Sequence, residues 1–114
     1  SAPWPRATKP MQAGADAPLP PPAMLVLPAE LTHRQARAVL QVLRRGVLAL
    51  PPGARAVVDA RALTQFDTAA LAVLLECRRT ALERGQTFAV QGLAPALASM
   101  AVLYGVQDLL PAAD

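Results

Sequence analysis

The chain has 114 residues, 54% of them hydrophobic, and a formal net charge of +3. This length suits one domain with a buried core. No apolar stretch reaches the roughly 18 residues of a bilayer span, and the opening residues lack the regions of a secretory signal. One cysteine and one histidine cannot build a disulfide or a zinc site. We therefore expect a cytoplasmic protein that holds no metal or other cofactor.

The positive charge is too weak to predict a nucleic-acid partner. Beyond residue 22 the chain carries nine arginines and seven acidic residues, and the whole chain has only four aromatic residues. Nucleic-acid binders usually combine a concentrated basic surface with exposed aromatic side chains. We expect no nucleic acid among the partners.

The first 22 residues differ from the rest in composition. They contain seven of the twelve prolines and no apolar period, so they cannot bury enough surface to offset the entropy of ordering. We expect a Pro-rich disordered lead, or in part a cloning remnant because the chain does not begin with Met. The folded domain is expected over residues 23–114.

The next part of the chain predicts a strand followed by a helix. Residues 24–27 form a short apolar run, with room for a continuation at Glu30 and Leu31. Thr32 and Gln35 have the spacing of a capping box, which predicts a helix from Thr32 to about residue 50. Its apolar stripe predicts a buried face, and its arginines are expected to be solvated because they lie off that stripe: Arg34, Arg37, Arg44 and Arg45.

Alternating strands and helices continue to the end of the chain. A covered strand is expected to end near Asp59, a helix follows from residue 67 and ends before Gly85, a strand contains Phe88 and Val90, and a third helix begins at Pro95. This order predicts an α/β domain with a mostly parallel four-strand sheet and three main helices.

The stretch FDTAAL (residues 66–71) places Asp67 and Thr68 together at a helix start. A nucleophile would need a base, but the only histidine, His33, stands a whole crossover away in the chain. Cys77 is interpreted as a small apolar residue of a helix. The sequence contains no phosphate-binding loop and no acidic cluster suited to a metal. No catalytic residue is predicted, so the chain is not expected to be an enzyme. Capping by either side-chain oxygen explains the pair locally, while an anion cradle, a phosphorylation site and a docking point stay open.

Context around this pair resembles the STAS family of small α/β domains. The strand in VVDARAL ends in Asp, and the next helix starts with Asp67, Thr68, Ala69 and Ala70, where the family has Asp, Ser or Thr, a small residue and Gly. The resemblance covers about residues 24–111. The segments FDTAALAVLLECRRTALERG and LASMAVLYGVQDLL look most like the MlaB-like STAS subunits of Mla phospholipid-transport ABC complexes.

That resemblance implies a STAS-like fold and a non-enzymatic module. It would bind and stabilise or regulate the ABC-transporter ATPase, in phospholipid transport and outer-membrane lipid asymmetry. It implies a cytoplasmic protein that reaches the inner membrane only through its complex. Asp67, Thr68 and Ala69 are the candidates for partner binding or phosphorylation. The alternative is an anti-sigma-factor antagonist phosphorylated on Thr68; Ala70 in place of Gly counts against recognition by its kinase.

Overall fold

The computed structural model describes residues 24–113. The predicted lead, residues 1–22, lies outside this range. Within residues 24–113, five strands and three α-helices follow one another, with a short 3-10 helix near the end: β2 (Met24–Val26), β3 (Glu30–Leu31), α2 (Ala36–Ala49), β4 (Arg55–Asp59), β5 (Gln65–Phe66), α3 (Thr68–Glu83), β6 (Thr87–Gln91), α4 (Pro95–Leu103) and η1 (Gln107–Leu109).

All strand pairs in the described part of the chain are parallel. The main sheet has the order β2-β4-β6, with Leu25 opposite Val58 and Val58 opposite Val90. Beyond β6, Ala112 forms a single parallel bridge with Val90. The strands β3 and β5 pair only with each other, in a separate two-stranded sheet. The predicted α/β class is therefore confirmed, but one of the four predicted strands lies outside the main sheet.

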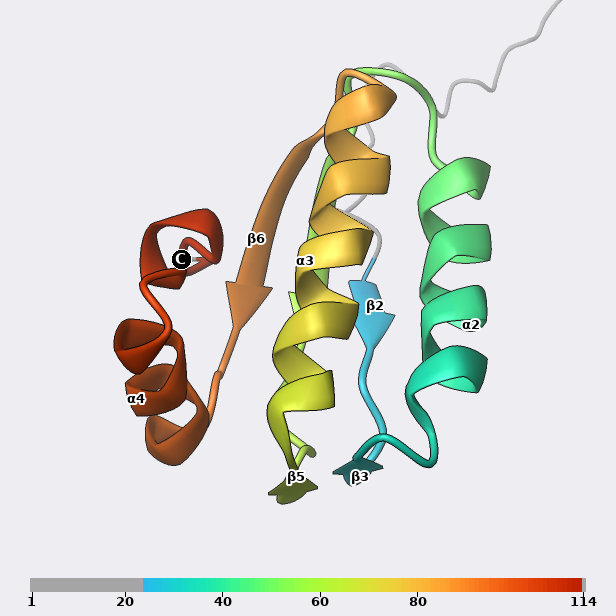
Figure 1. Ribbon diagram of the computed structural model, residues 1–114. Helices are drawn as coiled ribbons and strands as arrows, with labels where there is room; N and C mark the ends of the chain where they lie inside the picture. Colours follow the sequence, from blue (N-terminus) through green and yellow to red (C-terminus); the bar gives the residue numbers. More distant parts are fainter. Residues whose placement is uncertain (1–23, 114) are drawn as a thin grey trace, which may run out of the picture.

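Helices α2 and α3 lie side by side over one face of the main sheet, and α4 lies near the β6 edge (Figure 1). This follows from the strand order, because successive right-handed crossovers in one direction put their helices on the same face. The core between these layers is apolar, and its largest fully buried side chains are Leu27, Leu31, Leu43, Leu74, Leu97, Val47, Val58 and Cys77. The predicted stripe of α2 supplies Leu43 and Val47 to this core.

The α2 helix begins later than predicted. Gln35 Oε1 accepts hydrogen bonds from the backbone nitrogen of Thr32 at 2.9 Å and from its hydroxyl at 2.8 Å, so the capping-box pair does make contact. However, the backbone nitrogen of Gln35 donates to the carbonyl of Thr32, three residues back, which closes a turn. The helix therefore starts at Ala36, after this turn.

The far end of α2 is closed by side chains from the turn between α3 and β6. Gln86 Nε2 donates to the carbonyl oxygens of Val47, at 3.0 Å, and Leu50, at 3.4 Å. Arg84 also donates to the carbonyl of Leu50, at 3.0 Å. The last carbonyls of a helix have no partner within it, so these side chains take the place of the missing turn. Gln86 is only 3% exposed.

Candidate protein-binding site

The start of α3 shows which residue of the Asp67-Thr68 pair is the cap. Asp67 has an extended backbone, and its Oδ1 accepts a hydrogen bond from the nitrogen of Ala69 at 2.8 Å. Thr68 is the first helical residue, and its side chain is exposed. No side-chain hydrogen bond of Thr68 occurs within residues 24–113. Helix capping therefore explains Asp67 and leaves the hydroxyl of Thr68 available to a partner.

A second contact ties Asp67 to the turn before α2. Asp67 Oδ2 accepts a hydrogen bond from the backbone nitrogen of His33 at 3.0 Å, and it lies 3.1 Å from His33 Nδ1. These bonds, with the backbone bond to His33 as the largest cause, lower the pKa of Asp67 below its ordinary value. His33 is a whole crossover away from this helix start in the chain, but the fold brings the two together, and the His33 side chain is 76% exposed.

The small β3–β5 sheet explains why these distant residues meet. Leu31 pairs with Phe66, and Glu30 pairs with Gln65. Each strand ends just before one of the two contact residues, His33 and Asp67. Two residues per strand are too few to show an alternating pattern, so the sequence contains no signal for β5 or for the contact between His33 and Asp67.

Two apolar grooves flank the first half of α3. One, of about 280 Å³, lies between α3 and the chain after α4, and is lined by Thr68, Leu71, Ala72, Leu75, Tyr104 and Val106. The other, of about 290 Å³, lies between α2 and α3, and is lined by Ala36, Arg37, Leu40, Ala69, Ala72, Val73 and Glu76. Ala72 borders both. Asp67, Thr68 and Ala69 therefore lie on a ridge with a groove on each side. The small alanine side chains there would let a partner approach α3 closely.

The end of α4 adds exposed apolar surface near Thr68. Val102 is 59% exposed, Leu103 79% and Tyr104 58%, and Tyr104 lines the groove that also contains Thr68. Neighbouring exposed apolar side chains on a soluble domain commonly mark a surface that binds another protein. In the sequence, the signal for Tyr104 is an aromatic residue directly before the glycine that ends the third helix.

The aspartate that ends β4 has a structural role. Asp59 accepts hydrogen bonds from the backbone nitrogen of Arg61 at 3.0 Å and from its guanidinium at 2.9 Å. These bonds, those from the Arg61 side chain first, lower the pKa of Asp59. They hold the turn after β4 in place, and the side chain of Arg61 packs against Gly92. Asp59 is therefore engaged within the fold rather than presented to a partner.

Two further features of the described residues concern Cys77 and metal binding. Cys77 is buried, and burial raises the pKa of its thiol to about 11. Residues 24–113 contain no group of three or more acidic, His or Cys side chains that could hold a metal. Over the same range, no helix has the length and apolar content of a membrane span.

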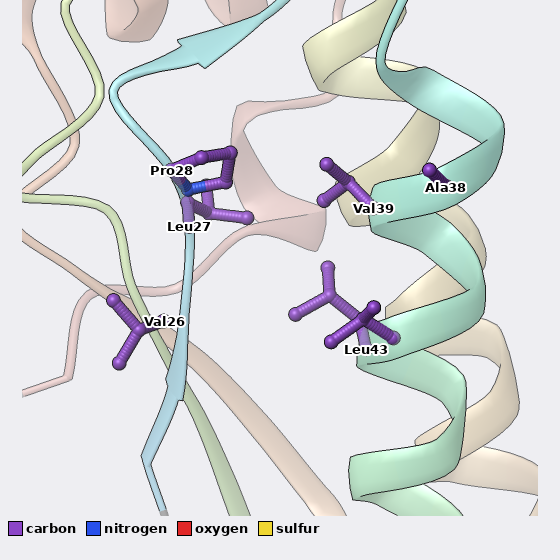
Figure 2. Close-up of a pocket in the computed structure, with 7 residues that line it drawn as sticks. Val26, Leu27, Pro28, Ala38, Val39 and Leu43 are labelled. Atoms are coloured by element: carbon purple, nitrogen blue, oxygen red, sulfur yellow. The ribbon is translucent and has the colours of Figure 1, made fainter.

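A further groove lies on the other side of α2, against β2 (Figure 2). It measures about 350 Å³, and Val26, Pro28, Val39 and Leu43 are among its entirely apolar lining. Small-molecule sites usually include a few polar groups that orient the ligand. This groove has no side chain that could do so, which leaves the ridge at Thr68 as the better candidate for function.

Comparison with known proteins agrees with this fold. The structure of an anti-sigma-factor antagonist (STAS) domain protein from Planctomyces limnophilus superposes with a TM-score of 0.67 at 12% sequence identity, covering 80% of this chain and 82% of that one. At this identity the likeness shows the fold alone. No curated protein matches the chain. A family model described as "Mlab, STAS domain" matches residues 20–111. Because that match spans most of the sequence, the chain belongs to the MlaB-like STAS domain family, which indicates a protein-interaction module.

Proposed function

We propose that this protein is a non-enzymatic subunit that binds the cytoplasmic ATPase of an ABC transporter and stabilises or regulates it. The transporter would move phospholipids and maintain the lipid asymmetry of the outer membrane. The protein would then be cytoplasmic and reach the inner membrane only through its complex. The proposal is supported by the MlaB-like family match and by one observation above all: Thr68 is exposed on a ridge between two apolar grooves.

The geometry of the ridge favours a protein partner. The grooves are open and mostly apolar, and the one that contains Thr68 also contains the exposed Tyr104 at the end of α4. Desolvation of such side chains against a partner is the main source of affinity in protein interfaces. The hydroxyl of Thr68 adds one exposed polar group that makes no side-chain hydrogen bond within residues 24–113.

An anti-sigma-factor antagonist phosphorylated on Thr68 is the second candidate. Its support is the exposed hydroxyl of Thr68 and the similarity to a solved anti-sigma-factor antagonist domain. The departure at Ala70 weighs against it. Ala70 is completely buried, so its methyl group belongs to the core and adds nothing to the exposed face.

The test begins with the protein that co-purifies from native cells. An ABC ATPase is expected, whereas recovery of a serine kinase in its place would favour the second candidate. Thr68→Glu is then compared with Thr87→Glu. Thr87 is an exposed threonine at the start of β6, at the end of the sheet opposite the start of α3. The control should bind as the wild type does.

The expected loss for Thr68→Glu is large in binding and small in stability. A carboxylate in the first helical turn gains about 0.3–1 kcal/mol from the helix dipole, and repulsion from Asp67 offsets part of this gain. An unpaired charge in a desolvated contact costs about 3–5 kcal/mol, which is more than roughly a hundredfold in Kd. ATPase binding equal to the wild type would refute the assignment of Thr68 to the interface, as would a Thr68→Glu chain that does not fold.

A further inference from the structure

The surplus positive charge of the described chain is concentrated on α2 and the turn before it. Residues 33–50 contain four arginines and no acidic residue, while the other five described arginines are matched by six acidic residues. All four arginines are exposed. Among residues 24–113, the ion pairs involve His33, Arg61 and Arg79 as the basic partners, so no arginine of α2 has an acidic partner there.

One of these arginines lines the groove between α2 and α3, and a second lies on the same stripe of α2. Arg37 lines the groove together with Leu40. Arg44 follows Leu40 by four residues, so Arg37, Leu40 and Arg44 form one stripe on the helix. Arg45 lies about 100° from Arg44 around the helix axis. It follows by three residues Val42, which lines the groove between α2 and β2. On the α3 side of the groove between α2 and α3, Glu76 Oε1 lies 3.6 Å from Arg79 Nη1.

We infer that this groove receives an amphipathic helix of the ATPase, and that acidic side chains of this helix pair with Arg37 and Arg44. The inference rests on the proposed function. A space between two neighbouring helices suits a third helix, whose apolar side chains would fill it above Ala36, Ala69 and Ala72. Seven residues separate the two arginines, which is about 10.5 Å along the axis, so the partner's acidic residues are expected about seven positions apart.

A membrane surface fits the same residues less well. The groove is concave and borders Ala69 and Ala72 of the candidate site. An interfacial helix would instead present a wide apolar face with aromatic anchors. The sequence of α2 contains no aromatic residue, and the exposed Val42 and Leu48 point in different directions around it.

The test compares neighbouring charge reversals on one helix. Arg37→Glu and Arg44→Glu are each expected to weaken binding of the purified ATPase about tenfold at low salt, and raising the salt concentration should shrink this effect. Arg45→Glu makes the same change of charge about 100° away around α2, and it should stay within about twofold of the wild type. Thermal unfolding of each variant shows whether the domain is intact. Lysine substitution of acidic residues in the ATPase should restore binding to Arg44→Glu.

The outcomes separate this inference from the proposed function. If the wild type does not bind the ATPase, both are overturned. If the wild type binds, Thr68→Glu does not, and all three arginine variants behave alike, only the acidic helix is refuted. Vesicles containing an anionic phospholipid are the last comparison. If Arg37→Glu and Arg44→Glu lose vesicle binding while ATPase binding is unchanged, the arginines face lipid and the inference is overturned.

Discussion

Replacing Gln86 by Glu is expected to destabilise the domain strongly, although the two side chains have almost the same shape. In the wild type, Nε2 donates to the carbonyls of Val47 and Leu50 at the end of α2. The substitution removes both bonds, worth about 1 kcal/mol each. It also directs a carboxylate at two carbonyl oxygens in a site that is 3% exposed. We expect a total loss of about 3 kcal/mol at neutral pH, or about 12–24 °C in Tm for a domain of this size.

The pH dependence and a matched variant identify the cause. Burial should raise the pKa of the introduced carboxylate above the unfolded value of about 4.3. The penalty should therefore be small near that value and grow as the pH rises through the folded pKa. Gln86→Leu loses the same two hydrogen bonds, worth about 2 kcal/mol, but it also removes Oε1, which is buried and has no hydrogen-bond partner among the described residues. Relief of that desolvation cost, about 1 kcal/mol, leaves a net loss of about 1 kcal/mol. Equal losses for Leu and Glu in urea unfolding at neutral pH would refute the reasoning.

Two further predictions concern the turn after β6 and the start of α3. Gly92→Ala should destabilise the domain by more than the about 1–2 kcal/mol that a left-handed backbone costs, because Gly92 has φ +71° and an added Cβ would collide with Arg61. Gly53→Ala should cost only the backbone part, because Gly53 has φ +84° and open space around it. Equal midpoints of urea unfolding for the two variants would contradict this. Asp67→Asn should be less stable than the wild type at neutral pH, and this difference should shrink as the pH falls through the lowered folded pKa of Asp67. A difference that does not change with pH in acid unfolding would assign it to a cause other than charge.

Periodicity was enough to predict the main layers of the fold. The stripe of α2, the consecutive buried residues of β4 and the glycine after α3 are local signals, and the structure confirms each of them. The separate β3–β5 sheet was not predictable in this way, because strands of two residues have no period. The delayed start of α2 also depended on a single backbone hydrogen bond in the turn at Gln35, which sequence spacing does not specify.

The candidate site was predicted in part. The pattern around residues 67–69 identified the helix start, but it could not decide which side chain is the cap, since Asp and Thr both serve. The choice depends on the extended backbone of Asp67. The contacts from His33 and Tyr104 come from segments far away in the chain, and only the tertiary fold brings them to this ridge. That these residues bind a partner stays a prediction.

The two-residue strands β3 and β5 have a consequence for the way this surface meets another molecule. They join the chain just before α2 to the chain just before α3, and the bond from His33 to Asp67 adds a second link at the same place. The first turns of the two helices therefore cannot move apart unless both links break. A ligand that touches both helices meets a surface whose shape is already set, and little entropy is lost in ordering it. Encounter should then resemble rigid docking, with small backbone shifts between the free and bound chains.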